Sequence, residues 1–296
     1  MIATEFEPVG VLRSLGIEPD GACRRVEGGW ATAIWQFKTA DGKGHSLRVF
    51  NRESERVAQR ERAAMSFAAG AGLPVPEVEA AGAWEGRPLL VLSWLPGVNL
   101  VEAAAKRPWQ IWRLGARMGA LQAKVHALRP PEELEADAPE RWLGRIGAIH
   151  PEVRALVEGS LSDEMGLMHM DYHPLNLLTD GREITGILDW PTATAGDRRA
   201  DLAMTTVLLK LAPVPPSPLR PVLKMARSLV HTSWRRAYTR AAGWPGNMAP
   251  FYAWAGAVFV NGNFGKVGND GVWATEADFE PFNRWIAEWT KRARLA

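Results

Sequence analysis

The chain has 296 residues, of which 47% are hydrophobic and 23% charged, and its formal net charge at pH 7 is +2. This balance excludes a disordered chain, and the length allows one large domain or two lobes. Cys23 is the only cysteine, which excludes an intrachain disulfide. We find neither a signal-peptide pattern nor an apolar run long enough to span a bilayer. We therefore expect a cytoplasmic protein without a membrane partner.

Residues 23–50 predict strands around a tight turn. The segments ATAIWQF and HSLRVF flank TADGKG, in which Asp41-Gly42 is a strong hairpin signal. Ahead of them, VEGGW places Gly28 and Gly29 where a loop could approach a ligand closely. A plain turn explains two adjacent glycines equally well.

The segment ESERVAQRERAAMSFAAGAG, residues 53–72, predicts a helix because apolar side chains recur near one face and glycine ends the pattern. Pro74 and Pro76 then keep LPVPEV extended.

RPLLVLSWLPG, residues 87–97, predicts a short buried strand that Pro96-Gly97 stops. We expect a lobe boundary here, with a hinge at about residues 92–97. Residues 1–95 would form an N-terminal lobe and residues 96–296 a larger C-terminal lobe.

Beyond the boundary, apolar side chains recur at three- and four-residue steps and predict mainly helices. In the helix expected over 221–243, the buried positions would be Leu223, Ala226, Leu229, Val230, Ser233 and Ala237. The last helix opens at Thr275 to Asp278, the spacing of a capping box. Strands first and helices afterwards predict an α+β fold: an antiparallel-sheet lobe followed by a mainly helical lobe.

Charge is unevenly distributed along the chain. Residues 202–269 contain no acidic residue but eight basic ones, whereas residues 131–164 contain nine acids and three arginines. Solvated helix faces explain both stretches, and the alternative is that one of them helps to select a charged ligand. Nucleic acid is not expected as a partner, because no zinc pattern, RNP motif or interleaved aromatic–basic tract is present.

The segment HMDYHPLNLL, residues 169–178, places Asp171 and Asn176 between apolar runs, and Asp189 follows in ILDW. The intervening LLTDGREITGIL predicts a hairpin turning at Asp180-Gly181, which would bring Asn176 and Asp189 side by side. Two such oxygen ligands suit Mg²⁺. Asp171, on the preceding loop, would be free to orient or deprotonate an attacking hydroxyl, and phosphoryl transfer requires this combination.

Each of these residues also has a structural interpretation. A single Asp or Asn beside a hairpin is more often a turn-former, but three at this spacing favour chemistry. His169 fits a structural brace better than a proton carrier, because Asp171 already has that role. His173, followed by Pro174, also fits an architectural role.

Together with GILDW and GDRRADLA, this block resembles the aminoglycoside phosphotransferase family, the small-molecule branch of the protein-kinase-like fold, over nearly the whole chain. The resemblance implies a two-lobed fold and a phosphotransferase that uses ATP and Mg²⁺ to phosphorylate a hydroxyl group of a small molecule. Asp171 would be the catalytic base, and Asn176 and Asp189 the magnesium ligands.

The N-terminal matches of the resemblance imply a nucleotide site. VEGGW lies where the family's nucleotide-covering loop lies, so Gly28 and Gly29 would cover the phosphates. LLVLSWLPG resembles the adenine-binding hinge, so Ser93, Trp94 and Leu95 would meet the adenine through backbone groups.

At the family's basic phosphate anchor, in LRVF, this chain has Arg48 instead of lysine. Strand alternation places Ser46, Arg48 and Phe50 on one face, so Arg48 can face the cleft. RERAAM resembles the helix that supplies the anchor's acidic partner, which makes Glu61 the expected partner and Glu55 the alternative. Arginine can bind phosphate bidentately, but it is longer and planar, so the exchange is not neutral.

Asp197 and Asp201 resemble the family's downstream acids. We expect structural roles for both, because Asp201 would be a good N-cap for an apolar helix starting at Leu202.

The acceptor is open at this stage. A polycationic aminoglycoside calls for carboxylates that residues 202–269 do not offer, so a sugar, a macrolide-like alcohol or a metabolite fits better. Four tryptophans are candidate pocket walls: Trp234, Trp244, Trp254 and Trp273. A protein kinase is disfavoured because Asp-Trp replaces Asp-Phe-Gly. The alternative of another class is a nucleotide-binding pseudokinase without turnover. ATP rather than GTP and the oligomeric state are not determined by these patterns.

Overall fold

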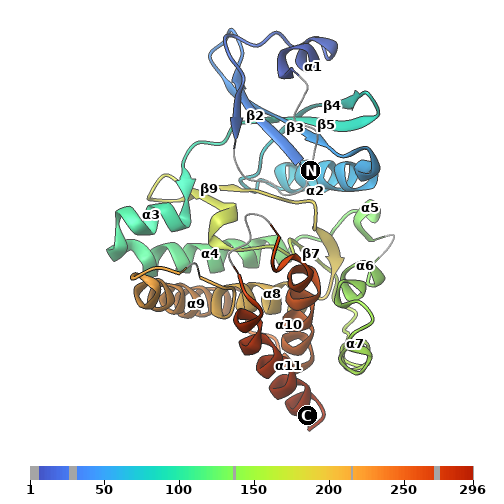
Figure 1. Cartoon of the computed structure of the whole chain (residues 1–296), viewed down its shortest axis with the longest axis vertical. Coiled ribbons are helices and arrows are strands. Elements are labelled where there is room, and N and C mark those ends of the chain that lie inside the picture. Colours follow the sequence, from blue (N-terminus) through green and yellow to red (C-terminus); the bar gives the residue numbers. More distant parts are fainter. Residues whose placement is uncertain (1–6, 27–31, 136–137, 215, 270–273, 296) are drawn as a thin grey trace.

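The computed structural model describes residues 7–26, 32–135, 138–214, 216–269 and 274–295. Its first part is a five-stranded antiparallel sheet in the order β1-β2-β3-β5-β4 (Figure 1). The strands are β1 (Arg24–Val26), β2 (Thr32–Lys38), β3 (Gly44–Phe50), β4 (Val78–Trp84) and β5 (Arg87–Ser93). The hairpin expected around Asp41-Gly42 is confirmed, because β2 and β3 pair with Thr32 opposite Phe50.

One helix covers each face of this sheet, as Figure 1 shows for α1 (Pro8–Ser14) and α2 (Glu55–Gly70). Successive side chains of a strand point to opposite faces. Leu47 and Val91 therefore pack in one cluster with Leu12 of α1, whereas Phe50 and Leu90 belong to the cluster that contains Met65 of α2. Arg48 shares the face of Phe50, so it points to the side where α2 lies.

Two small sheets follow. β6 (Val98–Asn99), β8 (Leu177–Thr179) and β9 (Ile184–Ile187) form one, and β7 (Gly166–Met168) pairs with β10 (Thr194–Gly196) in the other. The hairpin expected after Asn176 is confirmed: Leu177 pairs with Ile187, and Gly181 adopts a φ of 90° in the turn. Positive φ is a conformation that glycine adopts without strain.

The second part of the molecule is mainly helical. Its helices are α3 (Leu100–Lys106), α4 (Ile111–His126), α5 (Glu132–Glu135), α6 (Glu140–Leu143), α7 (Pro151–Glu158), α8 (Arg198–Lys210), α9 (Arg220–Ala242), α10 (Ala249–Asn263) and α11 (Glu280–Ala293). The capping box expected at Thr275 and Asp278 is present ahead of α11. No helix within the described ranges is long and apolar enough to cross a membrane.

The prediction of which face of α9 is buried is wrong in part. Ser233 is buried as expected, but its companions are Trp234 and Tyr238, whereas Leu223 and Leu229 are exposed. The reason is the partner helix. α4 presents Gly115 and Gly119 to α9, and a Cβ atom at Gly119 would lie 2.1 Å from the Trp234 carbonyl oxygen. Backbones can approach this closely only over small residues, so this stretch of α9 becomes its packing face.

Candidate active site

The loop between β7 and β8 holds Asp171 and Asn176 together. Asn176 Nδ2 donates to the backbone carbonyl of Asp171 at 3.0 Å and to its Oδ2 at 3.1 Å. His173 Nδ1 accepts from the Leu175 amide, which leaves Nε2 to donate toward Asp171 Oδ1 at 3.4 Å. Burial by itself would raise the pKa of Asp171, but its hydrogen bond with His173 and the nearby charge of Arg145 hold it below its ordinary value. Asp171 is therefore ionised at neutral pH and can accept a proton.

The hairpin returns the chain to this loop. The Leu188 amide donates to the Asn176 carbonyl at 2.8 Å, so Asp189 follows directly beside Asn176. Asp189 has a φ of 66°. Few non-glycine residues adopt this conformation, although Asp tolerates it better than most. The turn directs the Asp189 carboxylate out of the small sheet and toward Arg48.

Arg48 connects the large sheet to that carboxylate. Its Nη2 lies 2.9 Å from Asp189 Oδ1, Nη1 bonds Glu61 on α2, and Nε donates to the Thr32 hydroxyl at 3.2 Å. The structure thus brings Arg48 and Glu61 together, and Glu55 instead accepts from Gln59 at the surface.

The environment of this pair shifts both pKa values. Burial disfavours the charged form of Arg48, but Glu61 and Asp189 outweigh that effect and raise the pKa of Arg48. Burial raises the pKa of Glu61 to about 7, against the opposing effect of Arg48. The guanidinium therefore stays charged, and Glu61 is the group of the pair that titrates.

His169 is a brace between the loop and the hairpin. Its Nδ1 accepts from the Asp171 amide at 3.3 Å, so Nε2 carries the proton and donates to the Leu188 carbonyl at 2.9 Å. Its ring is fully buried edge-on against Trp190, and burial lowers its pKa. Both ring nitrogens are thus engaged, and the imidazole holds the loop against the hairpin.

The N-cap role expected for Asp201 is wrong. α8 begins four residues earlier than expected, at Arg198, and its N-cap is Asp197, whose side chain accepts from the Arg199 amide at 3.0 Å. Asp201 instead lies fully buried beside the loop that carries Asp171, where its carboxylate accepts from the amides of His169 at 3.3 Å and Met170 at 2.6 Å. Its role is structural, as expected, but it positions the loop and does not cap the helix.

Sequence reasoning missed the residues that hold Asp201. His126 Nε2 lies 2.8 Å from Asp201 Oδ2, and Gln122 Nε2 donates to the same oxygen at 3.1 Å. The two residues are four apart on α4 and so lie on one face of that helix. Burial opposes ionisation of Asp201, but these partners outweigh it and lower its pKa. Two polar residues at helical spacing on an apolar face were the available signal.

Arg145 is a second residue near the candidate site that sequence reasoning missed. Its Nη1 donates to the Met170 carbonyl at 3.4 Å, and burial lowers its pKa while Asp171 and Asp201 oppose that effect. It is a cation close to the proposed base, and an isolated arginine in a polar stretch gave no signal in the sequence.

The expected hinge residues are the last residue of β5 and the two that follow it, and their amides are not equally available. The Ser93 amide donates to the Glu77 carbonyl at 3.0 Å, and the Trp94 amide donates to Gly44 at 2.9 Å. Leu95 keeps an N–H without a partner in the described part of the chain. Gly28 and Gly29 lie outside the described residues.

Asn176 and Asp189 offer a donor set that fits Mg²⁺. Asn176 bonds through Nδ2, and no described residue donates to its Oδ1. The Asp189 side chain is 42% exposed and engages Arg48 through Oδ1, which leaves Oδ2 for a cation. Among the described residues, no three His, Cys, Asp or Glu side chains could hold a metal. The set suits a cation that combines one or two protein oxygens with phosphate oxygens.

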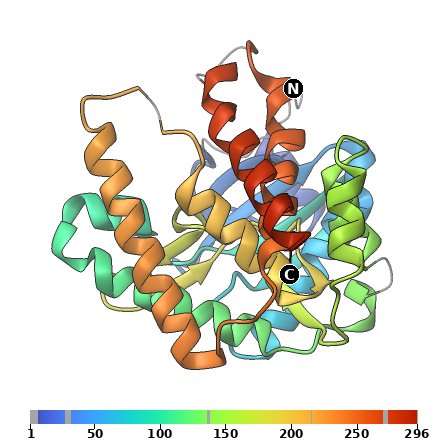
Figure 2. The ribbon, with the colours of Figure 1, turned by 90° about the horizontal axis from the view of Figure 1, so that it is seen from below.

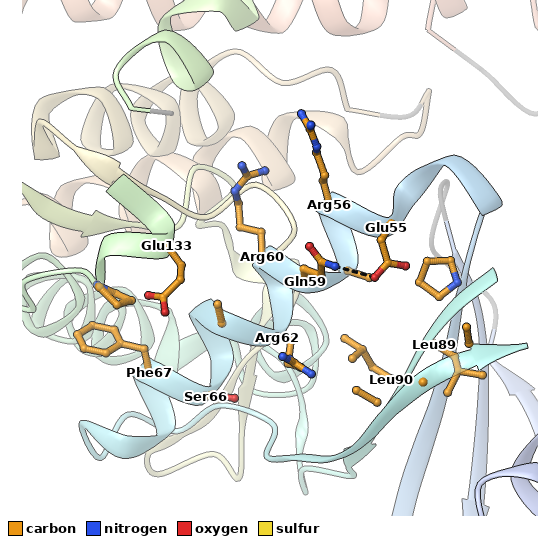
Figure 3. Close-up of a pocket in the computed structure, with 17 residues that line it drawn as sticks. Glu55, Arg56, Gln59, Arg60, Arg62, Ser66, Phe67, Leu89, Leu90 and Glu133 are labelled. Carbon is orange, nitrogen blue, oxygen red and sulfur yellow. Dashed lines mark hydrogen bonds between the residues drawn. The ribbon is translucent and has the colours of Figure 1, made fainter. Parts of the chain in front are cut away.

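A cavity of about 810 Å³ lies elsewhere, between α2, the β4–β5 edge and α5. Figure 3 shows Glu133 of α5 facing α2 across it. None of the proposed catalytic or metal-binding residues lines this cavity.

The tryptophans named as candidate pocket walls are largely core, which is the role that each of them fits better. Trp234 and Trp254 are fully buried, and Trp244 packs edge-on against Trp234 at 5.6 Å between ring centroids. Trp273 lies outside the described residues.

A family model described as "phosphotransferase enzyme family" matches residues 22–251 of the chain. No curated protein matches this chain significantly.

Three solved structures illustrate the likeness in fold. A thermostable mutant of aminoglycoside phosphotransferase APH(4)-Ia, in ternary complex with AMP-PNP and hygromycin B, is 18% identical over 98% of each chain, with a TM-score of 0.65. Amicoumacin kinase hAmiN, in complex with AMP-PNP, Ca²⁺ and Ami, is 13% identical over 97% of this chain and 94% of its own, with a TM-score of 0.67. Macrolide 2'-phosphotransferase MphH from Brachybacterium faecium is 19% identical over 94% and 97%, with a TM-score of 0.56. At these identities the likeness concerns the fold, and the expected α+β, protein-kinase-like class is confirmed.

Proposed function

The chain belongs to the phosphotransferase enzyme family, and from this premise we propose that it transfers the γ-phosphoryl group of ATP to a hydroxyl group of a small molecule. The observation that carries the proposal is the convergence of Asp171, Asn176, Asp189 and Arg48 through the hydrogen bonds described above. A proton acceptor, two oxygen ligands and a phosphate-binding cation are the parts that this reaction requires.

Asp171 would act on the acceptor. Its ionised carboxylate takes the hydroxyl proton as that oxygen attacks the γ-phosphorus, and the bond from phosphorus to the bridging oxygen of ADP breaks. Asn176 orients the carboxylate through its bond to Oδ2 at 3.1 Å, and Asp201 fixes the loop beneath it. An ionised acid of lowered pKa is a weak base, so orientation of the hydroxyl is the larger part of this role.

Arg48, Asn176 and Asp189 would hold the nucleotide. Asn176 Oδ1 and Asp189 would hold Mg²⁺, which when bound offsets negative charge on the phosphates. Arg48 would reach the phosphates as a planar donor, with Glu61 fixing its position. The proposal has three further parts. Residues 1–95 would form the nucleotide lobe, Gly28 and Gly29 would cover the phosphates, and Ser93 to Leu95 would meet the adenine. Of the last three, Leu95 N–H is the donor that we expect to meet the base.

The solved relatives support small-molecule chemistry, since two of them were crystallised with an ATP analogue and an antibiotic. We propose an acceptor of that size class.

The test is acceptor-stimulated release of ADP from ATP and Mg²⁺, measured over a panel of hydroxylated antibiotics, sugars and metabolites. We expect at least one acceptor to stimulate ADP release in the wild type and none to do so in Asp171→Ala. A pseudokinase would bind ATP with no acceptor-dependent release, and that result would overturn the proposed activity.

A further inference from the structure

The basic, acid-free stretch 202–269 converges on one cavity. This cavity, of about 500 Å³, lies between the end of α8, the first half of α9 and residues 277–281 at the start of α11. Figure 2 shows the end of α8 and the start of α9 on the same side of the helical lobe. Four of the stretch's eight basic side chains line the cavity: Lys210, Arg220, Lys224 and Arg227.

Little negative charge opposes these cations. Asp278 is the one acid among the lining residues, and it lies 3.3 Å from Arg220 Nη2 while also accepting from the amide and hydroxyl of Thr275. Arg227 donates to the carbonyls of Leu208, Leu209 and Ala212 and so closes the end of α8.

Lys210 and Lys224 are the two lining cations that no described carboxylate or carbonyl holds. Neither has a carboxylate within 4.0 Å in the part of the chain that the structure describes, and the Lys210 ammonium lies 5.8 Å from the Trp285 ring centroid. Arg227 also remains charged, but carbonyls fix its guanidinium and Asp278 offsets Arg220. Among the described residues, Lys210 and Lys224 are therefore the cations of the cavity left to meet a ligand.

The pKa of His231, on the cavity wall, is affected by the same positive charges. Burial lowers its pKa to about 4, and the nearby charges of Lys210 and Arg235 act in the same direction. At neutral pH the imidazole is uncharged, so it can accept or donate a hydrogen bond without adding a further charge.

α8 connects this cavity to the proposed catalytic loop. The Thr205 hydroxyl donates to the carbonyl of Tyr172, the neighbour of Asp171, at 3.1 Å. Leu209, on the cavity wall, is one turn further along the helix, a rise of about 6 Å at the usual 1.5 Å per residue. The loop that carries Asp171 and the cavity wall are thus contacted by successive turns of the same helix.

We propose that this cavity binds an acidic group of the acceptor, so that the acceptor is a hydroxyl compound that also carries a carboxylate, phosphate or sulfate. The inference rests on the proposed phosphotransferase function and specifies its substrate class. A cavity lined by cations attracts an anion and repels a polycation, so it also selects against aminoglycosides.

Binding is tested first, without turnover. The double variant Lys210→Gln/Lys224→Gln removes both free charges from the cavity. Arg240→Gln removes one exposed charge from the same helix, α9, outside the lining residues, and is the matched control. Citrate, glucose 6-phosphate and inorganic phosphate are titrated calorimetrically into protein saturated with AMP-PNP and Mg²⁺, at constant ionic strength. We expect at least one anion to bind the wild type and Arg240→Gln equally and the double variant roughly tenfold more weakly. Equal binding by all three proteins, or no binding of any anion, would overturn the inference.

Turnover then separates this inference from the proposed function. The acceptors are hydroxy acids and sugar phosphates, each paired with its methyl ester or unphosphorylated sugar. We expect the acidic member of a pair to stimulate ADP release, with KM roughly tenfold higher in the double variant and the dissociation constant for ATP unchanged.

Stimulation only by neutral or cationic acceptors would overturn the acidic-acceptor inference and leave the kinase proposal standing. ATP binding without release for any acceptor would instead overturn the proposed function, and the acceptor assignment with it.

Discussion

Met170 and Asp189 each hold a left-handed backbone in the candidate site, with a φ of 66°. Such conformations cost about 1–3 kcal/mol for a non-glycine residue and persist only where the surroundings enforce them. Asp201 provides that enforcement for Met170 by accepting its amide at 2.6 Å. Strain on both sides of Asp171 and Asn176 is what a site that fixes its side chains in advance requires.

The first residue-scale prediction concerns Asp189. Asp189→Ala should abolish Mg²⁺-dependent ATP binding, because the proposed cation site loses its carboxylate and Arg48 loses one of its partners. Calorimetric titration of ATP with and without Mg²⁺ measures this. Asp163→Ala, at an exposed position outside the hairpin, is the control and should bind like the wild type. Unchanged magnesium-supported affinity in Asp189→Ala would contradict the assignment.

The second concerns Asp171. Asp171→Asn keeps the shape of the side chain but cannot accept a proton, so turnover should fall roughly 100- to 10,000-fold. ATP affinity should change less than about twofold, since the proposed nucleotide contacts are made by other residues. Single-turnover kinetics together with equilibrium ATP binding separate the two quantities. A loss of binding as large as the loss of turnover would mean that Asp171 has a different role.

At the scale of elements, α4 and α9 meet with almost no space between their backbones. A Cβ atom on Gly119 would lie 2.1 Å from the Trp234 carbonyl oxygen and 2.9 Å from the Tyr238 amide, and neither backbone atom can rotate away. The same helix pair carries the network below the catalytic loop, since His126 bonds Asp201 and Tyr238 and Trp234 bonds Gln122. The helix contact therefore positions the loop.

Gly119→Ala should lower the free energy of unfolding by about 1–3 kcal/mol or more, because the added methyl group forces α4 and α9 apart. Gly70→Ala is the control: a Cβ atom at that end of α2 meets nothing within 4 Å, and alanine favours the helix. Chemical denaturation of both variants checks the prediction, and a Gly119→Ala protein as stable as the control would disprove the close packing.

His126→Ala tests the network itself. Asp201 would stay buried and lose its shortest side-chain hydrogen bond, so the free energy of unfolding should fall by about 1–3 kcal/mol or more. If His126 acts by positioning the loop, kcat should fall while the dissociation constant for ATP stays near that of the wild type. Equal stability in variant and wild type would contradict the buried hydrogen bond between His126 and Asp201 as the origin of the loop geometry.

At the scale of the whole molecule, Arg48 joins the two parts of the chain. It leaves the large sheet, binds Glu61 on α2 and meets Asp189 beyond the small hairpin, 141 residues away. The contact is well shielded from water: the Arg48 side chain is 12% exposed and the Glu61 side chain is fully buried. One side chain thus fixes both α2 and the proposed metal ligand relative to the sheet.

This arrangement predicts a pH-dependent variant. Arg48→Met leaves Glu61 buried without its cation, which lowers stability by about 3–5 kcal/mol when Glu61 is ionised. The pKa of Glu61 is about 7 with Arg48 present, and loss of the cation raises it further. A carboxyl group with a raised native pKa contributes stability below its unfolded value, near 4.5, and loses it as pH rises through the native value.

Arg48→Met should therefore be destabilised more at pH 8 than at pH 5. The double variant Arg48→Met/Glu61→Gln should recover most of the stability at pH 8 but not ATP affinity. Thermal unfolding across this pH range measures the first effect, and Mg²⁺-ATP titration the second. A pH-independent loss of stability in Arg48→Met would show that Glu61 does not titrate there.

The sequence by itself determined the features that depend on neighbours a few residues apart. Three such features follow from turn chemistry and from the periodic spacing of side chains. They are the turn at Asp180-Gly181, the strand alternation that points Arg48 toward α2, and the capping box at Thr275–Asp278. The family membership expected from HMDYHPLNLL is confirmed by the family model. The roles of Asp171, Asn176 and Asp189, and the lobe boundary near residue 95, stay predictions.

Tertiary structure alone decided the rest. Four features each join distant segments of the chain. They are the packing face of α9, the place of Asp201 under the loop, the second contact of Arg48 with Asp189, and the cavity that basic side chains line. Local pattern does not encode them, because several helix faces and several polar partners satisfy the same spacing. Which one is used depends on the close backbone approach and burial that only the assembled chain provides.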